Sequence, residues 1–319
     1  MAIFLTEQDV QSLLTMQDAL EAVEEGFRHW AQGQATNDPR RRLRVAGGYL
    51  QFMAAADHAL NITGFKAYTT GRNGGFLVNI YRADTGELLA IMQAGWLGAV
   101  RTGAASGVAT KYMARPDASI VGCIGAGYQA RTQIEAVCAV RPVREVRVFS
   151  RTPDKRQAFA HEMTQRLGIP VRPVESAQAC VEGAHIVITI TTSRDPVFNG
   201  EWLSPGTHIN AAGSNSWMRR ELDETTIRRA HLIVADQVED ARVECGELLW
   251  AVERGIIRWD QVRDLRDVVG GIIPGRPSPD AITLFESQGL ALEDIVTAWR
   301  IYQKAVERKV GISLPPFAS

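Results

Sequence analysis

One segment near the middle of the chain limits the possible folds more than any other. The apolar run Ser119–Ile124 leads directly into Gly125-Ala126-Gly127-Tyr128-Gln129-Ala130, and residues 129–140 have a helical pattern. In a strand–turn–helix, the first glycine permits a tight turn, the second lets the backbone approach a pyrophosphate, and the alanine allows close packing. The helix N-terminus then offers N–H groups to the phosphates. The segment predicts a dinucleotide-binding βαβ unit; the alternative is a turn whose glycines bind nothing.

The rest of this central region repeats the alternation of strand and helix. Helical segments such as 129–140 and 153–167 separate short apolar or β-branched runs at residues 119–124, 145–150, 171–174, 185–191, 208–212 and 232–235. Such alternation is typical of βαβ units on a parallel sheet. We therefore expect an α/β fold whose main part is a Rossmann doubly wound parallel sheet.

The first third of the chain has a different pattern. Apolar side chains recur at helical spacing over residues 15–32, and residues 42–92 contain alternating and β-branched runs with a hairpin turn at Asp84-Thr85-Gly86. Helices are expected again at 96–112 and 290–310. The 319 residues are about twice the ~150 typical of one domain. An α+β domain with antiparallel strands is therefore expected beside the Rossmann domain.

The end of the second Rossmann strand selects between nicotinamide cofactors. Ser150 stands about 25 residues after Gly125, near the usual place of the carboxylate that binds the 2′-hydroxyl of NAD(H). The sequence there is Ser150-Arg151-Thr152, and its hydroxyls and guanidinium suit a 2′-phosphate. This favours NADP(H) over NAD(H). Two alternatives remain open, because Asp154 is near and because Arg151 could stack on adenine or be a solvated loop residue.

Composition excludes several other functions. Thirty-five basic and 36 acidic residues give a net charge of −1, so neither nucleic acid nor an anionic membrane is an expected partner. The N-terminus does not resemble a signal peptide, and no apolar run is long enough to cross a bilayer. The four cysteines form no C-x-x-C pair and the six histidines no metal-binding pattern. We expect a cytoplasmic protein with reduced thiols and no metal.

Several motifs together resemble the ornithine cyclodeaminase/μ-crystallin family. They are Gly64-Phe65-Lys66, Ala99–Ser106, Ile124–Arg131, Gly206–Asn215 and Arg220–Asp223. The resemblance extends from near residue 40 to near residue 295. Each motif alone has little specificity, but their combination is specific. The resemblance implies hydride transfer between a nicotinamide and the Cα of an amino or imino acid.

The same resemblance implies the domain organisation and the assembly. A substrate-binding and dimerisation domain is expected at residues 1–115 with 296–319, and the Rossmann domain at 116–295. The subunits are expected to form a homodimer. In addition to the glycine motif and residues 150–152, the resemblance assigns cofactor contacts to Arg101, Thr102, Thr191, Gly213 and Asn215.

The resemblance also places the substrate carboxylate among basic residues. These match Lys66, Arg101 and one arginine of Arg40, Arg41 and Arg42. A guanidinium fork plus an ammonium would fix one face of the imine toward the cofactor. In an extended segment Arg40 and Arg42 share a face, so which arginine points inward is left open. The alternative for the arginine cluster is a solvated strand edge.

Two departures from the family pattern bear on the reaction. The resemblance implies an aspartate at Asn215 and a glutamate at Gln51 in the cyclodeaminases, but both residues are amides here. An amide forms hydrogen bonds but does not exchange protons, which argues against cyclodeamination. Reduction of an imine needs less acid–base chemistry. Lys66 is a candidate proton donor, the alternative being an imine that arrives already protonated, and Asn215 would orient the imine nitrogen and the carboxamide of the cofactor.

The number of cations near the expected site suggests a substrate. Arg40, Arg42, Lys66, Arg72 and Arg101 exceed what one carboxylate needs, which favours iminosuccinate, reduced to aspartate. Iminopropionate, reduced to alanine, is the second choice. The alternatives are an ornithine cyclodeaminase and a μ-crystallin-like protein that binds NADPH and a small ligand without turnover.

Overall fold

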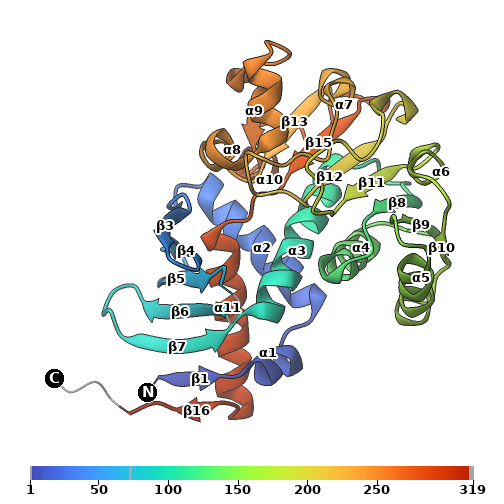
Figure 1. Cartoon of the computed structure of the whole chain (residues 1–319). Coiled ribbons are helices and arrows are strands. Elements are labelled where there is room, and N and C mark those ends of the chain that lie inside the picture. The colour runs from blue at the N-terminus through green and yellow to red at the C-terminus, as the bar shows by residue number, and fades with distance from the viewer. Residues whose placement is uncertain (1, 72–73, 316–319) are drawn as a thin grey trace. The chain divides into compact units, whose positions relative to one another are not determined.

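The structure, a computed structural model, describes residues 2–71 and 74–315. It divides into two compact units. Unit 1 is Met1–Arg101 with Leu290–Ser319, and unit 2 is Thr102–Gly289. Figure 1 shows the elements of each unit along the chain. The expected α/β class, with a parallel sheet and a separate sheet containing antiparallel strands, is confirmed.

These unit boundaries differ from the expected ones at residues 115 and 295. Helix α3 (Gly95–Met113) crosses the first boundary. From Thr102 onward it packs within unit 2, since the Thr102 carbonyl accepts a hydrogen bond from Gln133 Nε2 at 3.1 Å. A Cβ on Gly103 would lie 2.4 Å from the Thr132 carbonyl oxygen. The final long helix, α11 (Ala291–Arg308), lies entirely in unit 1.

Unit 1 is built on a mixed sheet with the strand order β16-β1-β7-β6-β5-β4-β2, and β3 pairs with β4. Neighbouring strands run antiparallel except for β1 and β7. The strands are β1 (Ile3–Leu5), β2 (Ala35–Asn37), β3 (Arg41–Val45), β4 (Gly48–Asp57), β5 (Ile62–Thr69), β6 (Phe76–Arg82), β7 (Leu88–Gln93) and β16 (Ile312–Ser313).

The helices of unit 1 include the one that the sequence predicts at residues 15–32. α1 (Glu7–Leu13) and α2 (Met16–Ala31) both open with a capping box, formed by Thr6 with Asp9 and by Thr15 with Asp18. α11 packs against one face of the sheet, as Figure 1 shows. Gly64 of β5 lies close to this helix, because a Cβ there would be 3.2 Å from the Ile295 side chain of α11. This packing buries the first turn of α11 against the sheet.

Unit 2 contains a fully parallel sheet with the order β10-β9-β8-β11-β12-β15-β13-β14. From β8 the chain adds β9 and then β10 on one side. It then crosses to the other side of β8 and continues with β11 and β12. The switch point, where ligands bind in such sheets, lies between β8 and β11. The strands are β8 (Ile120–Ile124), β9 (Glu145–Phe149), β10 (Val171–Pro173), β11 (Ile186–Thr189), β12 (His208–Ala211), β13 (Leu232–Ala235), β14 (Val262–Asp264) and β15 (Thr283–Glu286).

Helices connect these strands, and the main ones agree with the predicted alternation. They are α4 (Tyr128–Val140), α5 (Pro153–Leu167), α6 (Ala177–Val181), α7 (Glu224–Arg229), α8 (Val238–Glu244), α9 (Gly246–Glu253) and α10 (Leu265–Val269), with 3-10 turns at Gly200–Trp202 and Trp259–Gln261. Strands β14 and β15 were not predicted. β15 is fully buried between β12 and β13, so it has no alternation of buried and exposed residues to reveal it.

Cys123, Cys180 and Cys245 are buried, Cys138 is half-buried, and all four are free thiols. Among the helices of the described residues, none has the length and apolar character needed to cross a membrane.

Candidate functional site

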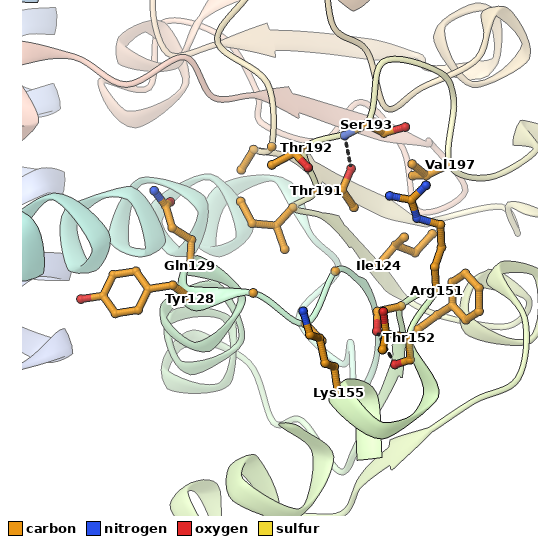
Figure 2. A pocket seen from close by; sticks show the side chains of 18 of the residues that line it. Ile124, Tyr128, Gln129, Arg151, Thr152, Lys155, Thr191, Thr192, Ser193 and Val197 are labelled. Carbon is orange, nitrogen blue, oxygen red and sulfur yellow. Dashed lines mark hydrogen bonds between the residues drawn. The ribbon is translucent and has the colours of Figure 1, made fainter. Parts of the chain in front are cut away.

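A cavity of about 810 Å³ lies at the carboxyl ends of β8, β9, β11 and β12, the position expected at the switch point (Figure 2). Ten of the predicted cofactor residues line it: Gly125, Ala126, Gly127, Tyr128, Gln129, Ser150, Arg151, Thr152, Thr191 and Gly213. The lining also includes residues that sequence reasoning missed, namely Lys155, Thr192, Ser193, Asp195, Pro196 and Val197.

The glycine turn has the geometry that a pyrophosphate requires. Gly125 has a φ of +123°, and a Cβ there would lie 2.3 Å from the Ile190 carbonyl oxygen, so the tight turn needs glycine. A Cβ on Gly127 would meet nothing within 4 Å. Gly127 is also the N-cap of α4, and no side chain caps that helix. The open space and the uncapped N–H groups fit a dinucleotide phosphate.

The end of β9 carries cations and hydroxyls. Ser150, Arg151 and Thr152 line the cavity, as does Lys155 in the first turn of α5. Figure 2 shows Thr152 and Lys155 across the cavity from Thr191, while the side chain of Arg151 extends toward Val197. Asp154 is not a lining residue of the described cavity. Lys155 could have been identified from the sequence, because it stands three residues after Thr152, about one helical turn along.

Three predicted cofactor residues do not line this cavity. Arg101 belongs to unit 1, and Thr102 is buried in α3. Asn215 is exposed in the loop after β12. The cofactor contacts expected of these three residues therefore stay predictions.

Unit 1 holds a second group of predicted residues, which are buried cations. Lys66 of β5 is 3% exposed, Arg101 of α3 is 6% exposed and Arg40, just before β3, is 9% exposed. Arg41 and Arg42 are exposed. The structure therefore singles out Arg40 as the buried arginine of the cluster, whereas Arg72 lies outside the described residues.

Two buried acids of α11 accompany these cations. Asp294 Oδ1 accepts hydrogen bonds from Lys66 Nζ at 3.0 Å and from Arg101 Nε at 2.9 Å. Glu293 Oε2 accepts one from Arg101 Nη1 at 2.7 Å. With both acids ionised and Lys66 protonated, this cluster, including Arg40, carries one formal positive charge. Sequence reasoning missed the acids, although adjacent carboxylates on a helix with an apolar stripe were a usable signal.

The environment of Lys66 changes its protonation. Burial, aided by the charges of Arg101 and Arg40, lowers the pKa of Lys66 to about 8, although Asp294 opposes the shift. Burial also raises the pKa of Glu293, against the effect of Arg101. Lys66 therefore titrates close to physiological pH, which suits a group that both binds a carboxylate and exchanges a proton.

Gln51 has defined partners in the same unit. Its Oε1 accepts hydrogen bonds from Arg42 Nε at 3.2 Å and from Tyr68 Oη at 2.9 Å. Both bonds go to the acceptor end of the amide. In this position Gln51 orients Arg42 and Tyr68 and offers no exchangeable acid group.

A glycine-rich cavity at the switch point of a doubly wound sheet defines a protein with a Rossmann dinucleotide-binding fold. Comparison with known proteins narrows the class. The chain belongs to the ornithine cyclodeaminase/mu-crystallin family, whose sequence profile matches residues 1–309. The resemblance stated from the motifs is therefore confirmed.

Three solved structures are similar over nearly the whole chain. The Δ1-pyrroline-2-carboxylate reductase of Thermococcus litoralis, in complex with NADH and L-proline, is 36% identical with a TM-score of 0.93, covering 98% of this chain and 100% of that one. An archaeal alanine dehydrogenase dimer with bound NAD is 33% identical with a TM-score of 0.93, covering 99% of each chain. The iminosuccinate reductase of Paracoccus denitrificans, in complex with NAD+, is 30% identical with a TM-score of 0.92, covering 98% of each.

Proposed function

We propose that the protein reduces a small α-imino acid to the L-amino acid with NADH or NADPH, and that it also catalyses the reverse oxidation. The buried cluster of Arg40, Lys66 and Arg101 carries this proposal, because its single residual positive charge suits the carboxylate of such a substrate. The cavity of unit 2 supports the use of a dinucleotide cofactor. The relatives named above, two imine reductases and an amino-acid dehydrogenase, support the reaction class.

The chain's own residues have distinct tasks in this mechanism. The Gly125–Gly127 turn and the α4 N-terminus would hold the pyrophosphate, and residues 150–152 with Lys155 would hold the adenosine end. The bound cofactor supplies or accepts the hydride. Lys66 and Arg101, held by Asp294, would bind the substrate carboxylate, and the Lys66 ammonium would give a proton to the imine nitrogen.

We propose a monocarboxylic substrate rather than iminosuccinate. The sequence argument for a diacid counted five cations. Glu293 and Asp294 offset two of them, and Arg42 is exposed and hydrogen-bonded to Gln51. Binding a second carboxylate there would leave excess negative charge in a buried place, which is costly. An imino acid with an apolar side chain avoids that cost.

The cyclodeaminase alternative is less well supported. Gln51 uses its amide oxygen to accept two hydrogen bonds, and Asn215 is an exposed amide, so neither supplies a carboxylate for acid–base work. For the cofactor, Arg151 and Lys155 with Ser150 and Thr152 favour NADPH, whose 2′-phosphate they suit.

The test follows NADH and NADPH absorbance with the purified protein. The substrates are Δ1-pyrroline-2-carboxylate, pyruvate with ammonia, and oxaloacetate with ammonia. We expect oxidation of the cofactor with at least one monocarboxylic imine at a kcat/KM at least tenfold above that with oxaloacetate and ammonia, about 1.4 kcal/mol in transition-state binding. Preference for oxaloacetate would refute the monocarboxylic choice. Cofactor binding without turnover of any imine would support a binding protein, and formation of proline from ornithine would support a cyclodeaminase.

The pH dependence of carboxylate binding tests the role of Lys66. Only the protonated ammonium attracts a carboxylate, and the pKa of Lys66 is lowered to about 8. The inhibition constant of propionate against the imino acid should therefore be flat below about pH 8 and rise above it, approaching tenfold per pH unit. In Lys66→Arg the guanidinium stays charged, so the rise should disappear. A wild-type inhibition constant that stays flat to pH 9.5 would contradict this role.

We propose that the chain forms a homodimer through the sheet of unit 1. Phe52 of β4 and Leu77 of β6 are exposed, and the strand register places both opposite Ala67 of β5, so they share one face. Exposed apolar side chains gathered on one sheet face favour a protein partner. Light scattering should return twice the mass of one chain, and a monomer mass at micromolar concentration would contradict the proposal.

A further inference from the structure

Glu221 is a buried carboxylate that does not line the cofactor cavity but holds residues that do. It is fully buried in the loop before α7. Glu221 Oε1 accepts a hydrogen bond from the Thr191 backbone N–H at 2.5 Å, and Oε2 accepts one from the Gly213 backbone N–H at 2.9 Å. Its backbone carbonyl accepts a third, from the Val197 N–H at 2.8 Å. All three donors belong to residues of the cavity lining.

These three residues define one half of the cavity. Thr191 follows β11 and Gly213 follows β12, and these strands are neighbours on one side of the switch point. The glycine turn lies after β8 at the switch point, and residues 150–152 follow β9 on the other side. If the glycine turn holds the pyrophosphate and the end of β9 holds the adenosine, the nicotinamide half of the cofactor lies at the ends of β11 and β12.

We propose that Glu221 is the positioning residue that fixes the nicotinamide half of the cofactor site by clamping the ends of β11 and β12. This inference rests on the proposed function, since it takes the cavity to bind a nicotinamide dinucleotide. Hydrogen bonds from N–H groups to a buried carboxylate are short and strong, so the Glu221 side chain ties the segment that follows β11 to the segment that follows β12.

The surroundings of Glu221 are built for this clamp. A Cβ on Gly213 would lie between 2.4 and 2.5 Å from the carboxyl atoms of Glu221, so only glycine lets the carboxylate reach that backbone. The Glu221 backbone N–H donates to Glu247 Oε1 at 2.6 Å, which fixes the residue from the side of α9. Burial raises the pKa of Glu221, while the bonds from Thr191 and Gly213 oppose the shift, as expected for a carboxylate that accepts both.

The experiment uses the full chain with the isosteric variant Glu221→Gln. A carboxamide has one acceptor oxygen, so one of the two N–H groups would face an NH2 group. We expect the Kd for NADH to rise at least tenfold, while the Kd for AMP, which lacks the nicotinamide half, changes by less than twofold. Equal loss of NADH and AMP affinity, or no loss of either, would overturn the proposal.

Two further variants keep the outcome interpretable. Glu201→Gln makes the same chemical change at an exposed residue of the same unit and should alter neither Kd. Gly213→Ala forces a methyl group against the Glu221 carboxylate and should reproduce the selective loss of NADH affinity, so it decides the question if Glu221→Gln does not fold. Wild-type protein that binds AMP but neither NADH nor NADPH would refute the proposed function itself, which is a different result from an unchanged Glu221→Gln.

Discussion

Replacing Asp294 by alanine should lower the free energy of unfolding by about 3–5 kcal/mol, because it leaves buried cations without their carboxylate. Asp294 itself is fully buried, and its Oδ1 accepts hydrogen bonds from both Lys66 and Arg101. After the substitution, Arg101 keeps Glu293 but Lys66 loses the only carboxylate recorded on its ammonium among the described residues. Urea denaturation followed by circular dichroism measures the change.

A matched control separates this loss from ordinary ion-pair effects. Arg28 and Glu24 form an ion pair at 3.1 Å in the same unit, but the Arg28 side chain is 47% exposed. Arg28→Ala should therefore cost less than about 1 kcal/mol. In the double variant Lys66→Met with Asp294→Ala, the loss should be smaller than the sum of the single losses, since neither charge then remains unpaired. Additive losses, or an Asp294→Ala loss no larger than that of Arg28→Ala, would contradict the coupling.

Gly127→Val should weaken NADH binding by about a hundredfold, about 2.7 kcal/mol, while changing the free energy of unfolding by less than about 1 kcal/mol. Gly127 has a φ of −91°, which valine adopts readily, and a Cβ there meets nothing within 4 Å. The side chain would therefore fill the space in front of the α4 N-terminus without disturbing the protein. Titration calorimetry with NADH, together with urea denaturation, measures both quantities.

Gly47→Val is the control for this substitution. A Cβ on Gly47 also meets nothing within 4 Å, but Gly47 lies in a turn of unit 1 and is not among the residues that line the dinucleotide cavity. It should leave NADH affinity unchanged. If Gly127→Val binds NADH as tightly as wild type, the glycine turn does not hold the pyrophosphate, and the assignment of the cavity fails.

Much of the cofactor cavity could be predicted from the sequence because its chemistry is local. The turn Gly125–Gly127 and the group Ser150–Thr152 are each formed by consecutive residues. Their residue types therefore show directly which backbone conformation each segment can adopt. Lys155 and Glu221 were not predicted. Lys155 needs only a helical turn to reach the cavity, whereas Glu221 reaches Thr191 and Gly213 through a loop that sequence periodicity does not describe.

The cations of unit 1 show the opposite case. The sequence identified Arg40, Lys66 and Arg101 and their number suggested a dicarboxylic substrate. Their effective charge depends on Asp294 and Glu293, which stand about 190 residues or more away in the chain and approach only when α11 packs on the sheet. The charge around a group depends on every residue that folding brings near it, so a count of cations along the sequence leaves out Asp294 and Glu293.

The sequence by itself determined the βαβ alternation, the glycine turn, the capped helices and the candidate cations, because each depends on neighbouring residues and on local backbone conformation. Only the tertiary structure decided that Arg40 is the buried arginine, that acids of α11 offset Lys66 and Arg101, and that Glu221 joins the ends of β11 and β12. These features depend on burial and on contacts between distant segments. Both arise on folding, because a polar side chain that is buried away from water needs a hydrogen-bond or ion-pair partner within the protein.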